Sequence, residues 1–329
     1  MRWAPTSKPA DSVDNTRPVA LFVLGPQRSG TSALTRVLSL SGGTLPPAML
    51  GADANNPLGY WEPRAAISLN ETILRRLGTN WYDPSLRFLD DGAVAPEKSK
   101  ACTAKIAAYL STLPAAPLVV IKEPRITTLS DLWFAAAREA GFQVASVIAV
   151  RHPQEVISSI VKSWHVSPAL ASALWLKCNF LAERNTRAVP RVFVDYANLL
   201  EDWRREVKRI SAELPIDLHT QDEDAIEEFI TPGLHRQRHR GPVTDLFGAN
   251  WISQVYEALH EAAQDGALDM STLDRVFASY RASERDFRKA FEDFHGLSNS
   301  MLFRIFRPGI ARPVMEAIAM AHRHKGTWA

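Results

Sequence analysis

Four short apolar runs, separated by stretches of helical length, constrain the fold of this chain more than any other feature. β-branched residues are frequent in each run, which is typical of buried strands. The runs are residues 19–25, 118–122, 144–150 and 191–195. Helical patterns cover 31–40, 128–140, a segment starting at 153, 168–187 and 199–214. Because strands joined by helices pair in parallel through right-handed crossovers, the sequence predicts a three-layer α/β fold.

The regions between and after these runs predict how the chain is organised. Residues 41–117 are rich in Pro, Gly, Asn and Trp, with helices expected at 65–77 and 97–113, and we interpret them as a substrate-facing insertion. Beyond 215 the pattern is helical, with helices expected at 256–263 and 273–294. Without a long Pro/Gly-rich linker, one α/β domain is more economical than two.

The predicted boundaries follow from this pattern. A polar tail, 1–17, precedes an α/β domain at 18–298, and a basic amphipathic tail occupies 299–329. Within the domain we expect nucleotide-binding elements at 18–40 and 118–205, the insertion at 41–117, and a helical C-terminal part at 216–298.

Charge and cysteine content exclude several classes of protein. Over 329 residues, 38 Lys and Arg balance 36 Asp and Glu to a net charge of +2, which argues against a dedicated nucleic-acid surface. The two cysteines, Cys102 and Cys178, lie far apart, so neither a disulfide framework nor a structural zinc site is expected. We predict a cytoplasmic protein, at most attached weakly to an anionic membrane through the basic tail, although a tail packed on its own domain is the alternative.

The loop after the first run, GPQRSGTS at 25–32, carries the clearest chemical signal. Two glycines five positions apart frame a loop that opens directly onto a helix, and backbone amides there can hold a phosphate. The nucleotide-triphosphatase version of this loop has a lysine where this chain has Thr31, and the positive charge here lies at Arg28 instead. The hydroxyls of Ser29, Thr31 and Ser32 equally suit a simple helix cap.

The pattern Pro-x-Arg-Ser-Gly-Thr-Ser resembles the 5′-phosphosulfate loop of sulfotransferases that use 3′-phosphoadenosine 5′-phosphosulfate (PAPS). The resemblance implies a P-loop-like sheet, PAPS as cofactor and adenosine 3′,5′-bisphosphate as product. It also implies nucleotide-binding roles for loop residues. These are Gln27, Arg28, Ser29, Gly30, Thr31 and Ser32.

A second element supports the resemblance. In that family an Arg ending a later strand and a Ser eight residues further on bind the 3′-phosphate, and Arg151 and Ser159 have this spacing. Pairing of Arg151 with Glu155 is the structural alternative. The segment 194–203 is similar to a Tyr-x-x-Leu-x-x-Asp stretch of these proteins, and its expected role is to cap a helix.

Transfer of a sulfuryl group to a hydroxyl requires a base. Glu62, in GYWEPR at 59–64, lies beside two aromatic residues and resembles the catalytic Glu of Gly-Glu-Pro-Arg motifs, although Trp61 replaces the glycine. The alternative is an acidic residue at the start of a helix. Glu123 is the rival base.

The segment IKEPR at 121–125 ends the second strand, where ligands bind in open α/β sheets. Lys122 resembles the family's catalytic lysine, and Arg28 joins it as a catalytic candidate. Glu123 lies close to where the cytosolic branch has a catalytic His. Arg125 either binds the acceptor or pairs with Glu123.

The sequence leaves alternatives open for the residues that bind the acceptor and for those that close the site. Tyr60, Trp61, Trp81 and Tyr82 offer flat faces to a sugar or aromatic ring, or belong to the core. The run LHRQRHR at 234–240 has no acid and could close over the nucleotide through Arg236 and Arg238, or be a solvated loop. No acidic cluster suggests a magnesium site, and no metal is expected.

These observations favour a PAPS-dependent sulfotransferase acting on a hydroxyl of a glycan, glycolipid or other metabolite. A protein-tyrosine acceptor is the nearest variant. A P-loop kinase or nucleotide triphosphatase is disfavoured by Thr31. A non-catalytic nucleotide-binding protein remains open.

Overall fold

The computed structural model of this chain describes residues 17–53, 56–90, 94–220, 222–230, 234, 239, 241–247 and 249–299, without the side chains of Phe88 and 291–299. The chain divides into two compact units. These are Met1–Pro84 with Phe88–Phe277, and Ser85–Arg87 with Ala278–Ala329. The sheet and the cavity described below belong to the first unit, and the sequence-based domain boundaries stay a prediction.

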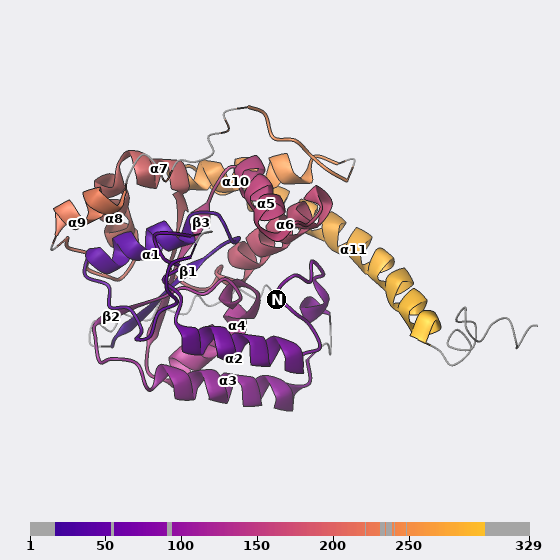
Figure 1. Ribbon diagram of the computed structural model, residues 1–329, viewed down its shortest axis with the longest axis horizontal. Coiled ribbons are helices and arrows are strands. Elements are labelled where there is room, and N and C mark those ends of the chain that lie inside the picture. The colour runs from indigo at the N-terminus through magenta and orange to yellow at the C-terminus, as the bar shows by residue number, and fades with distance from the viewer. Residues whose placement is uncertain are drawn as a thin grey trace, which may run out of the picture. The chain divides into compact units, whose positions relative to one another are not determined.

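A four-stranded parallel sheet organises the first unit (Figure 1). Its strands are β1 (Val19–Leu24), β2 (Leu118–Ile121), β3 (Gln143–Val150) and β4 (Arg191–Asp195), in the order β2-β1-β3-β4. Val19 pairs with Leu118 of β2 on one side and with Gln143 of β3 on the other. The chain therefore leaves β1 in one direction and later returns past it, which creates a topological switch point at the carboxyl ends of β1 and β3.

Helices cover both faces of the sheet, as the predicted three-layer α/β fold requires. On one face α1 (Thr31–Leu40) and α8 (Trp203–Glu213) pack on strand residues such as Leu21 and Val147. On the other face α4 (Ile126–Glu139) and α10 (Trp251–Ala263) contact the strands, and Phe22 of β1 packs edge-on against Trp133 of α4 at 6.2 Å. Strand residues are buried whichever face they point to, which explains their continuous apolar runs.

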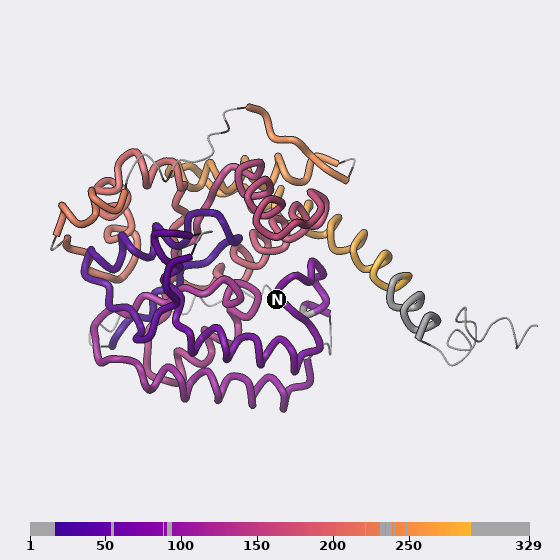
Figure 2. The backbone as a smooth tube through the Cα atoms, viewed as in Figure 1, coloured from indigo at the N-terminus to yellow at the C-terminus, as the bar shows by residue number. Residues whose placement is uncertain are grey.

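The remaining elements are one 3-10 helix and seven α-helices of the described part of the chain. They are α2 (Arg64–Arg76), η1 (Arg87–Leu89), α3 (Pro96–Leu110), α5 (Pro153–Trp164), α6 (Pro168–Asn185), α7 (Tyr196–Glu201), α9 (Glu223–Phe229) and α11 (Met270–Asn299). The insertion between β1 and β2 supplies α2 and α3, which lie side by side (Figure 1). In the backbone trace of Figure 2 the chain passes from β1 through one short loop into α1.

One helix prediction was wrong in a way that the sequence explains. The pattern at 199–214 predicted a single helix, but the structure has two, α7 and α8, which meet at Asp202. Asp202 has an extended backbone (φ −147°, ψ 82°), and its carboxylate accepts a hydrogen bond from the Arg205 amide at 3.0 Å. An aspartate that caps the next helix stabilises a break that apolar periodicity alone does not reveal.

One helix begins earlier than predicted, and one helix was not predicted at all. The helix expected at 256–263 begins at Trp251, where Asp245 accepts hydrogen bonds from the amides of Ile252 and Ser253. Helix α9 was not predicted, because its seven residues contain a single buried side chain, Ile226. Short polar helices give little periodic signal.

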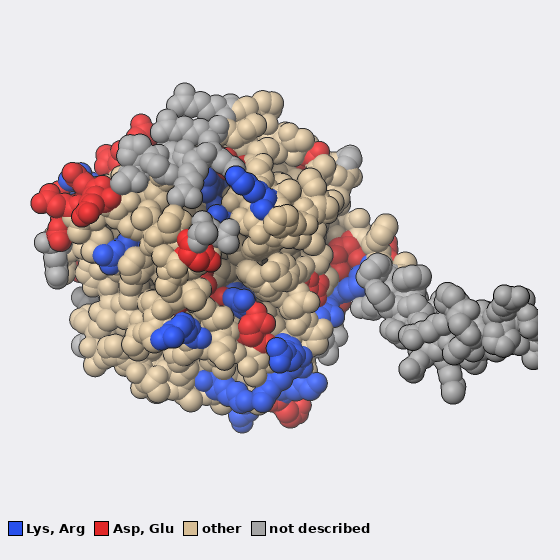
Figure 3. Space-filling model, in the orientation of Figure 1, with Lys and Arg blue, Asp and Glu red and all other residues tan. Residues whose placement is uncertain are grey.

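Charge is distributed unevenly over the first unit. On the face shown in Figure 3, acidic side chains gather over α9 and basic ones over α2 and α3. The exposed acidic residues of α9 are Glu223, Asp224, Glu227 and Glu228, and the exposed basic residues of α2 and α3 are Arg64, Arg75, Arg76, Lys98, Lys100 and Lys105. The small net charge is therefore a sum of opposite local excesses.

Gly30, at the start of α1, has no room for a side chain. Its φ is 90°, and a Cβ there would lie 2.1 Å from the ring of Tyr196. We predict that Gly30→Ala lowers the free energy of unfolding by more than about 2 kcal/mol, measured by urea denaturation, because strain and overlap add. Gly78→Ala is the matched control: its φ is 71°, but nothing lies within 4 Å of the added Cβ, so a loss of about 1 kcal/mol is expected. Equal losses in the two variants would contradict the close approach of Tyr196.

Candidate active site

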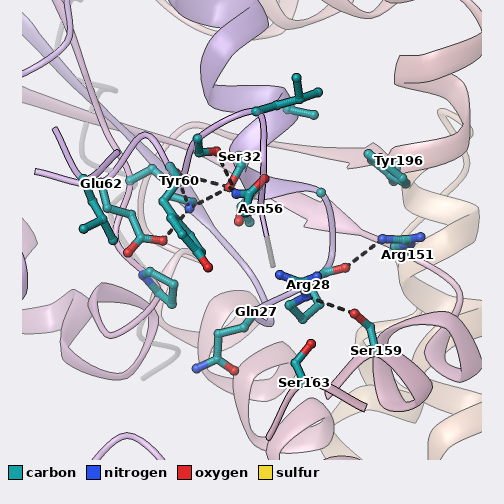
Figure 4. A pocket seen from close by; sticks show the side chains of 18 of the residues that line it. Gln27, Arg28, Ser32, Asn56, Tyr60, Glu62, Arg151, Ser159, Ser163 and Tyr196 are labelled. Atoms are coloured by element: carbon teal, nitrogen blue, oxygen red, sulfur yellow. Dashed lines mark hydrogen bonds and ion pairs between the residues drawn. The ribbon is translucent and has the colours of Figure 1, made fainter. Parts of the chain in front are cut away.

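A cavity of about 610 Å³ opens at the carboxyl ends of β1, β2 and β3 (Figure 4). This is the volume of a small-molecule site. Its walls come from the loop after β1, the segment 56–62, the residues that follow β2, helix α5 and the first residue of α7. The switch point of the sheet thus coincides with the cavity.

The loop after β1 forms one wall. Arg28 and Gly30 both adopt left-handed backbone conformations, with φ of 68° and 90°, which turn the chain sharply before α1. No side chain caps the start of α1, and Gly30, Thr31, Ser32 and Ala33 line the cavity. The amides of a first helical turn have no partners within the helix, so this wall offers hydrogen-bond donors and positive dipole to an anion.

Among the six loop residues predicted to bind a nucleotide, Ser29 is the one that does not line the cavity. Its side chain is 1% exposed and donates its hydroxyl hydrogen bond to the Pro26 carbonyl oxygen, and it is not among the lining residues. The predicted contact of Ser29 with a nucleotide could therefore come only from its backbone. Gln27, by contrast, does line the cavity, as Figure 4 shows.

The two predicted anion-binding elements meet at the cavity. Arg28 donates from Nε to the Ser159 hydroxyl at 2.9 Å, and Arg151 donates from Nη1 to the Arg28 carbonyl oxygen at 2.9 Å (Figure 4). Arg151 also lies over the ring of Tyr196, 4.4 Å from its centroid, and pairs with Glu155 at 2.7 Å. The alternative of an Arg151–Glu155 pair is thus observed as well, and it leaves Arg151 in the cavity wall.

Lys122 and Glu62 form a buried ion pair in the opposite part of the cavity wall. Lys122 is 2% exposed and Glu62 is 6% exposed, with 2.7 Å between Nζ and Oε1. The same ammonium donates to the Tyr60 carbonyl oxygen at 2.8 Å and to the Ser32 hydroxyl at 3.1 Å. An ammonium has three donors, and all three are used, so Lys122 links β2, the segment before α2 and the start of α1.

Glu123 lies behind this wall, whereas its partner Arg125 lines the cavity. Glu123 is fully buried and is not among the residues that line the cavity. Its carboxylate accepts from Asn70 Nδ2 at 2.6 Å, from the Arg125 amide at 3.1 Å and from the Arg125 guanidinium. Arg125 also pairs with Glu71 at 2.6 Å. Of the two roles considered for Arg125, pairing with Glu123 is the one observed.

Burial raises the pKa of Glu123 to about 7, because desolvation of the carboxylate outweighs the opposing effects of Arg125 and Asn70. Tyr60 is also perturbed. Burial and the hydrogen bond from its hydroxyl to Asp53, at 2.8 Å, raise the pKa of Tyr60 to about 12, which keeps the phenol protonated.

The predicted aromatic acceptor residues divide into two groups. Tyr60 and Trp81 line the cavity. Trp61 does not: its indole nitrogen donates to the Leu58 carbonyl oxygen at 3.1 Å, and Arg36 lies 4.5 Å from its ring centroid. The expectation that Trp61 faces an acceptor is therefore not met by this geometry.

Several cavity residues were not singled out from the sequence. They are Asn56, Lys162, Ser163, Trp164 and Tyr196. Ser163 and Trp164 follow Ser159 by about one helical turn on α5, so a helical projection from Ser159 would have indicated them. Asn56 reaches the site only because its segment folds back onto α1, where its Nδ2 lies 3.4 Å from the Ser32 hydroxyl. Arg236 and Arg238 lie outside the described residues.

Among the described residues, no group of three or more His, Cys, Asp or Glu side chains could hold a metal ion. Both cysteines are buried free thiols. None of the described helices combines the length and the apolar character needed to cross a bilayer.

The chain is similar to several solved structures, with low TM-scores. No protein-family model matches the chain, and neither does any curated protein. The sulfotransferase domain of the olefin synthase from Synechococcus PCC 7002 matches with a TM-score of 0.40 and 24% identity, covering 84% of this chain and 98% of that one. TT1252 from Thermus thermophilus matches with a TM-score of 0.34 and 20% identity, covering 60% of this chain and 98% of that one.

A third solved structure is sulfotransferase STF1 from Mycobacterium tuberculosis H37Rv, with a TM-score of 0.32, 18% identity, and coverage of 67% of this chain and 73% of that one. Two of the three similar structures are thus sulfotransferases by name. All three TM-scores are below 0.5, so the function must be argued from the residues of the site.

The raised pKa of Glu123 predicts a pH dependence of stability. Between about pH 4.5 and 7, Glu123 keeps its proton in the folded protein, whereas in the unfolded chain, where Glu has an ordinary pKa of 4.5, this proton is lost. The free energy of unfolding therefore falls as the pH rises through this range. Between pH 5 and pH 8 the wild type should lose about 1 to 2 kcal/mol more unfolding free energy than Glu123→Gln, measured by urea denaturation. Glu97→Gln, at an exposed position, should follow the wild type. Parallel pH curves for the wild type and Glu123→Gln would contradict the assignment.

Proposed function

We propose that the protein is a PAPS-dependent sulfotransferase that transfers a sulfuryl group to a hydroxyl acceptor. The observation that carries the proposal is the meeting of two anion-binding elements in one cavity with a buried Lys–Glu pair. Arg28 from the loop after β1 and Ser159 from α5 are 131 positions apart and in hydrogen-bond contact. Such a cavity suits a compact ligand with an anionic group near each element.

The residues present fit a phosphosulfate and a 3′-phosphate. The uncapped start of α1 and Arg28 would hold the 5′-phosphosulfate, and Arg151 with Ser159 would hold the 3′-phosphate. Thr31 stands where a nucleotide triphosphatase needs its lysine, which disfavours ATP. When bound, PAPS supplies the sulfuryl group, and adenosine 3′,5′-bisphosphate is the product.

Glu62 and Lys122 would divide the chemistry of transfer between them. Glu62 accepts the proton from the acceptor hydroxyl. Lys122 exchanges its hydrogen bond to the Ser32 hydroxyl, the longest of its three at 3.1 Å, for one to the transferred group and stabilises the negative charge there. In the structure Lys122 and Glu62 lie 2.7 Å apart, and their mutual attraction offsets part of the free-energy cost of burying both charges in the cavity wall. Glu123 lies away from the lining and is bound to Asn70 and Arg125, so Glu62 is the better placed base.

Glycans and glycolipids are the acceptors we propose from the sequence, with other hydroxyl-bearing metabolites and protein tyrosine as variants. A weak attachment of the basic C-terminal tail, 299–329, to an anionic membrane would suit a glycolipid acceptor. Residues 300–329 of that tail lie outside the described residues.

Ligand preference tests the proposal directly. A ligand that binds only the folded state raises the melting temperature. Adenosine 3′,5′-bisphosphate should raise it by several degrees at concentrations where ATP with magnesium has little effect, measured by differential scanning fluorimetry. The reverse preference would favour a kinase or nucleotide triphosphatase and end this proposal.

Arg151→Ala serves as the specificity control for this experiment. Loss of one charge-assisted phosphate contact should weaken binding of the 3′,5′-bisphosphate about tenfold or more and leave 5′-AMP almost unchanged. An equal loss for both nucleotides would place Arg151 elsewhere than at the 3′-phosphate.

Removal of the base is the second test. Glu62→Gln preserves the shape of the side chain and a hydrogen bond to Lys122 but cannot take a proton, so transfer from ³⁵S-labelled PAPS into an extract should fall by about 10²-fold or more. Binding of the bisphosphate should stay within about twofold of the wild type, and Glu97→Gln should be fully active. Full activity in Glu62→Gln would move the base to Glu123.

A further inference from the structure

Three aromatic side chains form a cluster at the rim of the cavity. The rings of Trp81 and Trp164 lie 4.8 Å apart at 55°, and Tyr82 lies 4.6 Å from Trp81 and 5.1 Å from Trp164. Trp81 and Trp164 line the cavity, and Tyr82 is 39% exposed. The cluster is therefore partly open to ligands and is not a sealed piece of the core.

Trp81 is held in place by a buried polar network. The guanidinium carbon of Arg125 lies 4.4 Å from the Trp81 ring centroid. Arg125 is fixed by the fully buried Glu123, which in turn accepts from Asn70. Asn70 accepts from the indole nitrogen of Trp133 at 2.8 Å. Because every link is a hydrogen bond, an ion pair or a cation–π contact between packed groups, the wall is rigid before any ligand binds.

Helix α5 joins this wall to the donor part of the cavity. Ser159, which contacts Arg28, and Ser163 line the cavity one turn apart, and Trp164 ends the helix. At about 1.5 Å of rise per residue, Trp164 lies only about 7.5 Å along the axis from Ser159. An acceptor resting on the wall would thus adjoin the proposed position of the sulfuryl donor.

We propose that the Trp81–Trp164 wall binds the acceptor through an aromatic ring that carries the reacting hydroxyl. This inference rests on the proposed function but selects aromatic hydroxyls, which were variants there, as the acceptors in place of glycans and glycolipids. The three rings meet at 55° to 84°, and Arg125 covers Trp81, so the wall offers ring edges and tilted faces. An aromatic ring binds such surfaces by edge-to-face contact, because its π face attracts the positive edge of a neighbouring ring, whereas a sugar ring has no π face.

Transfer of the sulfuryl group involves the acceptor hydroxyl, PAPS and Glu62. The acceptor oxygen forms a bond to sulfur, the bond from sulfur to the phosphate oxygen breaks, and the acceptor proton passes to Glu62. Two sources of aromatic hydroxyl share this chemistry, a free phenol and a tyrosine side chain. Both would use the same wall.

Calorimetric titration tests the wall without depending on turnover. Protein saturated with adenosine 3′,5′-bisphosphate should bind 2-naphthol at least tenfold more tightly than methyl α-D-glucopyranoside. Trp164→Ala should weaken the binding of 2-naphthol about tenfold, because the edge contacts with one ring are lost, and Trp164→Phe should restore most of it. N-acetyltyrosinamide forms the third arm: binding as tight as that of 2-naphthol indicates tyrosine, and weaker binding indicates a free phenol.

Matched controls separate this inference from the proposed function. Trp251→Ala removes an indole from α10, outside the cavity lining, and should bind 2-naphthol like the wild type. Affinity for the bisphosphate should be unchanged in all Trp variants. Equal binding of 2-naphthol and the glucoside, or no effect of Trp164→Ala, overturns the aromatic wall even where the bisphosphate binds well. Failure of the wild type to bind the bisphosphate overturns the proposed function instead.

Discussion

The hydrogen bonds of one ammonium group hold the candidate site together. Lys122 uses its three donors on Glu62, the Tyr60 carbonyl oxygen and the Ser32 hydroxyl. These acceptors belong to segments that are distant in sequence, so the lysine fixes the segment before α2 against the start of α1. A buried charge is tolerated only when it is paired and fully hydrogen-bonded, and Lys122 and Glu62 satisfy this condition for each other. Positioning of the cavity wall and placement of the reactive groups therefore depend on the same interaction.

The parallel sheet explains why the site forms where it does. β1 stands between β2 and β3, so the residues that follow these strands converge at one edge. Lys122 follows β2, Arg151 follows β3, and the loop with Arg28 follows β1. Three cations from separate parts of the chain thus approach one cavity, and a nearly neutral protein gains a local site for anions. Gly30 permits this convergence, because any larger residue would meet the Tyr196 ring.

Lys122 and Glu123 illustrate how two neighbouring charged residues at one strand end acquire different surroundings. Lys122 and Glu123 are neighbours, but successive residues leaving a strand point to opposite sides. Lys122 therefore faces the cavity with Glu62, while Glu123 turns into the interior, where Asn70 and Arg125 bind it. Arg125, which is paired with Glu123, also lies 4.4 Å from the ring centroid of Trp81. One strand end thus supplies both a charged pair in the cavity wall and the polar contacts behind it.

The sequence by itself determined the sheet, most helices and the loop at 25–32, because apolar periodicity, glycines and caps are local signals. It also indicated Glu62, Lys122, Arg151 and Ser159, through the resemblance of short motifs to those of a known family. Only the tertiary structure decided which of these face one another: that Arg28 contacts Ser159, that Trp61 lies outside the cavity lining, and that Trp164 meets Trp81. Side-chain partners far apart in sequence depend on strand order and on how the insertion folds back, and no local pattern carries that information. The break at Asp202 is the converse case, in which a local cap overrode a periodic pattern.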